Sequence, residues 1–273
     1  MSGRRRVETA HLSMRGTREL YSGIRVAPSE GRSGVPPDVP LDHDTISTLP
    51  YTRYQMDGKE PHSTRPLYAV WIVLFILAVL LALAVKYCAF FPGDVAVERW
   101  VQSKAPQDLN WAKAISRTAE FPRLLIILAF VLALSWRLSG WPAALLSILS
   151  LAGMLVLGNW LGPLIARPRP SPELVHVLRP LTGYSFPSLF ALRYAATFGF
   201  LAVLAASRSS AAPRILLLTV CAILLILGFV ARVALAAHWP SDVIISYYLG
   251  VLWAAFIIRF AANGLTHRAP DRT

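Results

Sequence analysis

The chain has 273 residues, of which 55% are hydrophobic, and its mean hydropathy is +0.50. A water-soluble domain does not carry so many apolar side chains, so these values exclude an ordinary soluble protein and indicate a bilayer environment. The formal net charge of +12 fits a membrane protein that faces anionic lipid. The basic residues are scattered outside the apolar runs, so we expect no nucleic-acid partner.

Residues 1–66 differ in composition from the rest of the chain. They are rich in Arg, Ser, Gly, Pro and Asp and lack a periodic apolar pattern, which is typical of a disordered segment. The run from Arg4 to Arg6 is followed by no hydrophobic core within the reach of a signal peptide, so we expect no cleaved signal sequence. We interpret residues 1–66 as a basic cytoplasmic tail, and a regulatory or lipid-headgroup contact is the alternative.

Six hydrophobic segments follow this tail. The first, residues 67–85, is long enough to cross a bilayer, which takes about 20 apolar residues. The sequence predicts an all-α, six-span membrane bundle over residues 67–260 and a short cytoplasmic tail at residues 261–273. The other five candidate spans are residues 124–136, 141–161, 189–206, 215–231 and 243–260.

Residues 93–121, between the first two candidate spans, have a different pattern. Their apolar residues recur at a spacing of three to four. This spacing predicts two short amphipathic helices that lie at the membrane surface.

The basic residues also predict an orientation. In a six-span chain the N-terminal tail, Arg137, the 208–214 loop and the C-terminus fall on one side. Cytoplasmic loops carry an excess of Lys and Arg, so we expect this side to be cytoplasmic. The expected location is a bacterial cytoplasmic membrane, with the site described below facing outward.

The opposite face receives the loops at residues 162–188 and 237–242. It also receives Arg167, Arg169 and Arg179, which contradict the positive-inside rule. Charged residues placed against the expected topology are candidates for function.

The stretch "ARVALAAHWPSDV" carries an Arg, a His and an Asp at the end of the fifth span. A guanidinium such as that of Arg232 is costly in a membrane unless it has a partner. Proline is favoured in the first turn of a helix, so Pro240 is expected to begin the last span and to hold His238 at its mouth. Asp242 is close enough to accept a hydrogen bond from one ring nitrogen, which leaves the other nitrogen free as a nucleophile. A His beside a Trp is ordinary at a membrane interface, but the three residues together favour function.

The stretch "ARPRPSP" contains Arg167 and Arg169. Two arginines separated by prolines form a stiff set of donors suited to phosphate oxygens. The alternative interpretation is a pair of interfacial arginines that reach toward lipid headgroups at the end of a span.

The order Arg-Pro, then Phe-Pro-Ser, then Arg-x5-His-x3-Asp resembles the type-2 phosphatidic acid phosphatase family, which shares its site with vanadium-dependent haloperoxidases. The resemblance covers about residues 67–260, and the six-span layout matches the family's membrane members. The third motif is nearly whole, with Ala231 in place of the usual Ser.

This resemblance implies a role for each matching residue. Arg169 and Arg232 would bind the phosphate, and Ser188 would help to hold it. His238 would be the nucleophile that forms a phosphohistidine, with Asp242 orienting its ring.

The first two motifs depart from the family pattern. The position of the family's Lys, counted back from the Arg-Pro motif, holds Gly162, and the family's Gly-His pair is replaced by Leu189 and Phe190. In the family this His is the general acid that protonates the departing alcohol oxygen, and a phenylalanine has no proton to give. A positioned general acid contributes about 10²- to 10⁴-fold in rate. The missing Lys also removes a charge from the clamp around the phosphoryl group.

Two nearby residues are candidate substitutes. Arg193 follows Phe190 by three residues, so on a helix it lies on nearly the same face and could replace the lost charge. Its alternatives are a pair with Asp242 or a lipid headgroup. His176 could serve as a replacement acid or be a solvated loop residue.

The leading interpretation is a membrane protein that binds a phosphorylated lipid headgroup and has weak or lost phosphohydrolase activity, as a pseudoenzyme would. Any residual activity is expected to favour lipid diphosphates, such as polyprenyl diphosphates, over phosphatidic acid. A phosphate leaving group has a second pKa of about 6 and needs less help than an alkoxide. The alternatives are a competent lipid phosphatase with a substitute acid and a non-catalytic membrane scaffold, so the sequence leaves enzyme status open.

No metal or organic cofactor is implied by these patterns. The hydrophobic spans and the missing Lys and His disfavour haloperoxidase chemistry. Cys88 and Cys221 both lie in apolar sequence, so we expect two free thiols rather than a disulfide or a metal site. The sequence makes no prediction of the oligomeric state.

Overall fold

The computed structural model describes residues 65–178, 181–207 and 211–266. The chain divides into two units, Met1–Glu60 and Pro61–Thr273, and the described residues all lie in the second. The predicted N-terminal tail therefore lies outside the described residues except at positions 65–66, and Arg179 also lies outside them.

The described residues form helices and connecting loops, with no strand among them. This confirms the predicted all-α class. In chain order the helices are α1 (Arg65–Tyr87), α2 (Asp94–Lys104), α3 (Asn110–Thr118), α4 (Arg123–Ser139), α5 (Trp141–Ile165), α6 (Leu189–Tyr194), the π-helix η2 (Ala195–Gly199), α7 (Phe200–Ala206), α8 (Ala211–Ala234) and α9 (Pro240–Thr266).

Five segments in the described part of the chain are long and apolar enough to cross a membrane. The predicted second span, α4, qualifies only together with α3, from which it is bent by 59°. The number of spans is thus five, or six if this bent pair crosses as one. The five segments are Tyr68–Tyr87, Trp141–Ile165, Leu189–Ala206, Ala211–Ala234 and Pro240–Ala261.

The segment Leu189–Ala206, made of α6, η2 and α7, is the central span of the bundle. In this segment 72% of residues are buried, compared with 11% for Tyr68–Tyr87. Its aromatic side chains pack with those of neighbouring spans in the main apolar cluster. The residues that follow the Phe-Pro-Ser sequence therefore belong to both the cavity described below and the core.

Several helix ends differ from the predicted bounds. The last span begins at Pro240, as predicted, but it continues to Thr266. Helix α5 extends past residue 161 to Ile165, although Pro163 in its last turn lacks the N–H that would bond the carbonyl four residues earlier. It ends at Ala166, whose φ of 55° is left-handed.

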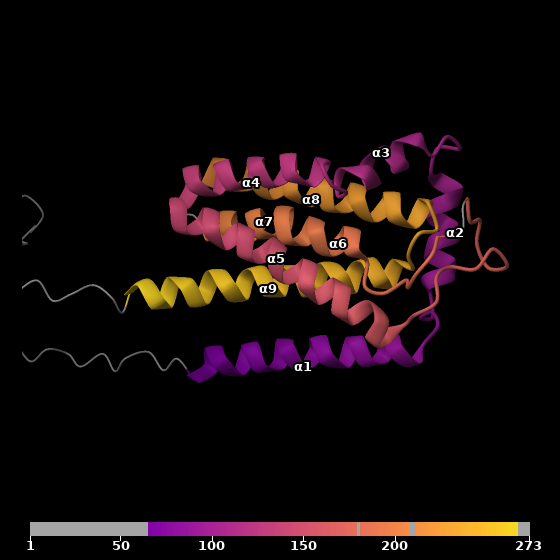
Figure 1. The fold of residues 1–273 in the computed structure, drawn as a ribbon, viewed down its shortest axis with the longest axis horizontal. Coiled ribbons are helices and arrows are strands. Elements are labelled where there is room, and N and C mark those ends of the chain that lie inside the picture. The colour runs from indigo at the N-terminus through magenta and orange to yellow at the C-terminus, as the bar shows by residue number, and fades with distance from the viewer. Residues whose placement is uncertain (1–64, 179–180, 208–210, 267–273) are drawn as a thin grey trace, which may run out of the picture. The chain divides into compact units, whose positions relative to one another are not determined.

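Two short helices, α2 and α3, lie where the sequence predicted an amphipathic pair. Helix α2 buries Asp94, Glu98 and Val101, and the Val101 side chain packs against Val233 and Ala234 near the end of α8. The α5–α6 and α8–α9 connections lie at the same end of the bundle as α2, whereas the chain enters α1 and leaves α9 at the opposite end (Figure 1). The two predicted functional loops are therefore neighbours.

Candidate functional site

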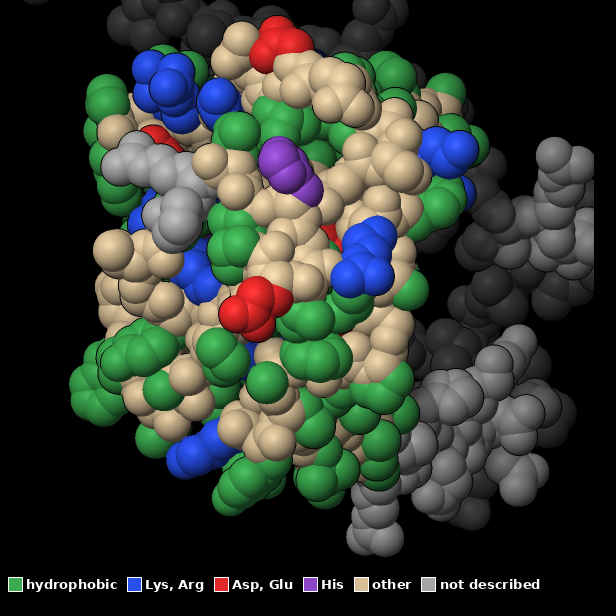
Figure 2. All heavy atoms as spheres, turned by 90° about the vertical axis from the view of Figure 1, so that its right-hand side faces the viewer, with side chains coloured by type: hydrophobic (Ala, Val, Ile, Leu, Met, Phe, Trp, Pro, Cys, Tyr) green, Lys and Arg blue, Asp and Glu red, His purple; other side chains and the backbone are tan. Residues whose placement is uncertain are grey.

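A cavity of about 440 Å³ lies at the end of the bundle where these loops meet. Figure 2 looks onto this end and shows Lys and Arg side chains at several places around it. The cavity brings together residues from the helices α3, α5, α6 and α8 and from the α3–α4, α5–α6 and α8–α9 connections. Seven positions singled out from the sequence line it: Gly162, Arg169, Leu189, Phe190, Arg193, Arg232 and His238.

Arg232 reaches the cavity from the last turn of α8. Its Nη1 donates to Ser116 Oγ at 3.0 Å, and its guanidinium carbon lies 5.5 Å from the centre of the Phe190 ring. Its Nε is buried and has no hydrogen-bond partner in the described part of the chain. The guanidinium therefore keeps donor capacity for a ligand.

Arg169 and Arg193 reach the cavity from the loop after α5 and from α6. Arg169 donates to the carbonyl oxygens of Ala237 and Thr182, and Arg193 Nη1 donates to the Ala119 carbonyl at 2.8 Å. Burial lowers the pKa of Arg169 below its usual 12.5, and the negative charge of Asp242 partly opposes this shift. The Arg193 Nε, like that of Arg232, is buried without a partner among the described residues.

The three guanidiniums have no ion pair with a carboxylate within 4.0 Å among the described residues. Both ion pairs that the structure describes belong to Arg167. Of the described residues, Glu120 is the one carboxylate that lines the cavity, and its side chain is exposed at the turn between α3 and α4. The cavity therefore has a net positive lining, which suits a phosphate group.

His238 is buried in the α8–α9 connection, with 4% of its surface exposed. Its Nδ1 is hydrogen-bonded to the Ser185 carbonyl oxygen, so Nδ1 carries the proton and Nε2 is free. Burial holds the His238 pKa well below 6.5, the positive charges of Arg232 and Arg169 add to this effect, and the Ser185 hydrogen bond opposes it. At neutral pH the ring is thus neutral, which is the form a nucleophile requires.

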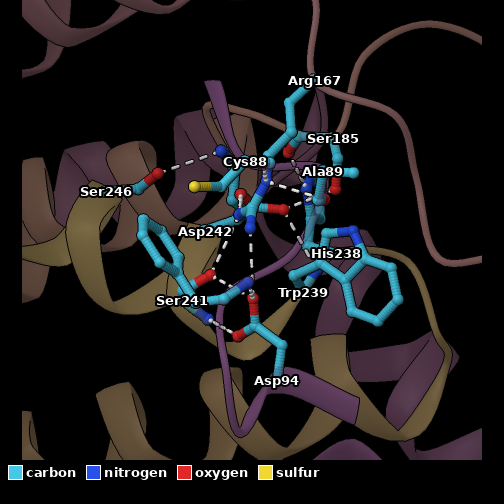
Figure 3. A network of polar contacts seen from close by, with 12 residues as sticks. Cys88, Ala89, Asp94, Arg167, Ser185, His238, Trp239, Ser241, Asp242 and Ser246 are labelled. Atoms are coloured by element: carbon cyan, nitrogen blue, oxygen red, sulfur yellow. Dashed lines mark hydrogen bonds and ion pairs between the residues drawn. The ribbon is translucent and has the colours of Figure 1, made fainter. Parts of the chain in front are cut away.

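The sequence predicted that Asp242 would accept the hydrogen bond from His238, and the structure instead gives this role to the Ser185 carbonyl. Asp242 acts one step away, because its Oδ2 accepts from the Ser185 hydroxyl and from the Trp239 backbone N–H at 3.1 Å. Figure 3 shows the carboxylate between Arg167 and the segment that carries Ser185. Asp242 therefore orients His238 by fixing its neighbours on both sides.

Comparison with known proteins supports the fold. Residues 143–264 match the family model described as "PAP2 superfamily". The resemblance to the type-2 phosphatidic acid phosphatase (PAP2) family is confirmed. The chain is an integral membrane protein with a lipid-phosphatase-like fold. No curated protein matches the chain.

A solved structure with the same fold is that of a transmembrane PAP2-type phosphatidylglycerolphosphate phosphatase from Bacillus subtilis. The match has a TM-score of 0.55 and 18% sequence identity, and it covers 74% of this chain and 98% of that chain. At this identity the likeness concerns the fold, so the roles of individual residues depend on the geometry of the cavity.

Arg167 does not line the cavity where a phosphate ligand was predicted for it. The side chain is 1% exposed, and its Nη1 and Nη2 pair with Asp242 and Asp94, the latter at 3.1 Å. Nη1 also donates to Ser241 Oγ at 2.9 Å. Nε donates to the carbonyl oxygens of Cys88 and Ala89, which follow α1. All three nitrogens are occupied, so Arg167 is a brace beneath the PAP2 site (Figure 3).

Ser188 of the second PAP2 motif is also turned away from the cavity. Its hydroxyl caps α6 by accepting from the Ala191 N–H at 3.3 Å, and its own N–H donates to Ser246 Oγ at 3.0 Å. The side chain is fully buried, and Ser188 is absent from the described cavity lining. The Phe-Pro-Ser sequence thus starts the central span with a cap that is typical of helix N-termini.

The three positions that the sequence analysis found to depart from the family pattern all lie on the cavity wall. Leu189 is 36% exposed and Phe190 is 5% exposed. At Gly162 the nearest atoms to an added Cβ would be Tyr184 Cδ2 at 3.7 Å and the Phe186 carbonyl at 4.0 Å. The wall is therefore apolar at Leu189 and Phe190, and a Cβ at Gly162 would make ordinary van der Waals contacts.

His176, the predicted candidate for a substitute acid, does not line the cavity. It is exposed, and its backbone is held by Gln102, whose Nε2 donates to the His176 carbonyl at 2.8 Å. The structure therefore does not bring this imidazole into the cavity.

The sequence interpretation missed Asp94, Glu98 and Ser185. The Asp94 carboxylate accepts hydrogen bonds from the backbone N–H of Ser241 at 2.9 Å and from the Ser241 hydroxyl at 2.7 Å. These bonds join α2 to the start of α9. Acidic side chains on an amphipathic surface helix resemble a solvated face, so they gave no signal of burial. In the described part of the chain no three His, Cys, Asp or Glu side chains are grouped as a metal site requires.

Proposed function

We propose that this protein binds the headgroup of a phosphorylated lipid in the cavity and has weak or lost phosphohydrolase activity. One observation carries the proposal: Arg169, Arg193 and Arg232 line one cavity without a carboxylate ion pair among the described residues. The missing acid at Phe190 and the missing Lys at Gly162 favour binding over turnover.

Any residual activity would use the neutral imidazole of His238. Its Nε2 attacks phosphorus, a P–N bond forms, and the bond to the leaving oxygen breaks with its electron pair. Water then attacks the phosphohistidine, the P–N electron pair returns to the ring, and phosphate is released with a proton. When the substrate is a lipid diphosphate, such as a polyprenyl diphosphate, the leaving group is a lipid monophosphate, which needs no strong acid. A lipid diphosphate is therefore the preferred substrate over phosphatidic acid.

The purified protein in detergent tests this proposal with dioctanoyl phosphatidic acid and farnesyl diphosphate as probes. We expect Arg169→Ala and Arg232→Ala each to weaken binding at least 10-fold, because each removes a charge-assisted contact to phosphate. His238→Ala should leave binding nearly unchanged and abolish any release of phosphate.

Two outcomes would contradict the proposal in different ways. Equal and rapid phosphate release from both probes, abolished by His238→Ala, would indicate a competent phosphatase with a substitute acid. Binding that ignores both arginine substitutions would indicate a membrane scaffold. A phosphohistidine trapped at His238 during diphosphate turnover would support the residual route.

We also propose that the cavity faces outward from a bacterial cytoplasmic membrane, with residues 1–66 and 261–273 as cytoplasmic tails. The arrangement of the connections supports this proposal. The loops that form the cavity lie at one end, and the α4–α5 connection, which follows Arg137, lies at the other end with both chain exits (Figure 1). The basic residues of that second end favour the cytoplasmic side.

A further inference from the structure

Phe190, which replaces the PAP2 acid, lies against one of the predicted phosphate ligands. The guanidinium carbon of Arg232 is 5.5 Å from the centre of its ring, within the range of a cation–π contact. The ring comes from the first turn of α6 and the guanidinium from the last turn of α8. Both side chains line the cavity.

The Phe190 ring is held firmly in this place. It packs on the Tyr194 ring, with 4.2 Å between ring centres and 31° between planes. Tyr194 is fixed in turn by a hydrogen bond between its hydroxyl and that of Thr118, and by an edge contact with Phe198 at 5.0 Å. A ring anchored in this way presents a fixed face to the guanidinium.

Two glycines on neighbouring helices make room for the apolar pair. A Cβ added at Gly228 would lie 2.8 Å from Phe190 Cε1 and 2.8 Å from the Tyr247 hydroxyl. A Cβ added at Gly158 would overlap Leu189 Cδ2. Contacts this short require a neighbour to move. The end of Leu189 is partly exposed and can move, whereas the Phe190 ring is buried, so the packing around the ring depends on Gly228.

Arg232 has few other anchors. In the described part of the chain, its one hydrogen bond runs from Nη1 to Ser116 Oγ, and no carboxylate pairs with it within 4.0 Å. Without the ring, the guanidinium would be free to rotate about this single bond. An ordered guanidinium loses less conformational entropy when it binds phosphate.

We propose that Phe190 is a positioning residue for phosphate recognition: its ring holds the Arg232 guanidinium at the cavity. This inference rests on the proposed function, because it assumes that Arg232 meets the ligand. It assigns a purpose to the residue that replaces the acid, since a protonated His at this position would repel Arg232. The expected contribution to affinity is about 3- to 30-fold.

The test replaces Phe190 with mono-, di- and trifluorinated phenylalanine in the full-length protein. Fluorination withdraws the negative potential from the ring face and keeps the ring's shape. We expect the affinity for dioctanoyl phosphatidic acid and for inorganic phosphate to fall stepwise with fluorine number, at an unchanged thermal midpoint. Phe200 is the matched control, because it is buried on the same span and has no cation–π contact among the described residues.

Phe190→Leu, which keeps an apolar side chain but removes the ring, should give a loss at least as large as trifluorination. An affinity that is constant across the fluorinated series, or one that falls equally with the series at Phe200, would overturn the positioning role. Arg232→Ala separates the two proposals. If it weakens binding while the series does not, the positioning role alone fails. If wild-type protein binds neither probe, both proposals fail.

Discussion

At the scale of single residues, the cavity is lined by a buried imidazole and by an apolar ring. The His238 ring is buried and neutral, with its Nδ1 fixed by Ser185 and its Nε2 free. Phe190 has no proton to transfer and lies instead over Arg232. In the proposed reaction these two residues have opposite effects on the rate. The neutral His238 ring can attack phosphorus, whereas Phe190 cannot protonate the leaving group.

Introducing a histidine at position 190 tests whether the proposed weak activity is limited by the lack of a general acid. Leu189→Gly combined with Phe190→His should raise phosphate release from dioctanoyl phosphatidic acid by about 10²-fold or more. Adding Gly162→Lys should raise it further, because the space around Gly162 accepts a Cβ. The KM should rise at the same time, since Arg232 loses the Phe190 ring. Release that stays at the wild-type rate in both variants would show that these positions do not account for the missing activity.

Glu98 gives a prediction about stability. Both its carboxylate oxygens are buried without a partner among the described residues. Burial raises the Glu98 pKa from 4.5 to about 8, and the charges of Asp94 and Asp242 add to the shift. The folded protein therefore keeps a proton that the unfolded chain releases above pH 4.5, so stability falls as pH rises from 4.5 to about 8, by at most about 1.4 kcal/mol per pH unit.

Glu98→Gln should flatten this decline, because the amide has no proton to lose. The measurement is the thermal midpoint of detergent-solubilised protein between pH 5 and 8. Glu173→Gln is the control, because Glu173 is exposed and should leave the slope unchanged. The same slope in wild type and Glu98→Gln would contradict the assignment.

At the scale of elements, Arg167 connects segments that are far apart in the chain. It contacts the residues after α1, the first residue of α2 and the first turn of α9. Asp242 in turn accepts a hydrogen bond from the Ser185 hydroxyl, and the Ser185 carbonyl accepts one from His238. The position of the imidazole thus depends on a buried charge network rather than on one hydrogen bond.

The two arginines of the Arg-Pro-Arg-Pro sequence should therefore respond differently to substitution. Arg167→Ala leaves Asp94 and Asp242 without their cation and should cost about 3–5 kcal/mol of folding stability. Arg169→Ala should weaken phosphate binding with a much smaller change in the thermal midpoint. Thermal unfolding and probe binding, measured on both variants, check this contrast, and a reversed pattern would contradict it.

The spans could be predicted because a membrane span is recognised from the length and apolar composition of one continuous stretch of sequence. The order of the motifs indicated which loops meet. The partner of each side chain could not be predicted. Arg167 and Asp242 are 75 residues apart, and their pairing depends on how the bundle closes. Ser188 was assigned to phosphate by its motif, although its hydroxyl caps α6. A motif identifies the segments that meet but does not fix the rotamers within them.

At the scale of the whole molecule, the connections between spans separate into two ends of the described bundle. The α5–α6 and α8–α9 connections carry the cavity at one end, and the α4–α5 connection lies at the other (Figure 1). This separation gives the proposed orientation a direct consequence, because a reagent that cannot cross the membrane reaches only one end.

Single cysteines, introduced after replacement of Cys88 and Cys221, test the orientation. Glu173→Cys, in the loop between α5 and α6, should react with an impermeant maleimide in intact cells. Arg137→Cys, in the last turn of α4, should react only after the cells are permeabilised. Both residues are exposed, so access rather than burial decides the result. Labelling of Arg137→Cys but not of Glu173→Cys in intact cells would contradict the proposed orientation and indicate the opposite one.

The glycines opposite Leu189 and Phe190 bear on how this site changes over time. The Phe190 ring occupies space that Gly228 leaves vacant, so we expect these two positions to vary together. A Cβ added at Gly228 alone would meet the ring and the Tyr247 hydroxyl, whereas the end of Leu189 is exposed enough to move away from a Cβ at Gly158. Relatives with a larger residue at position 228 are therefore expected to carry a smaller one at position 190.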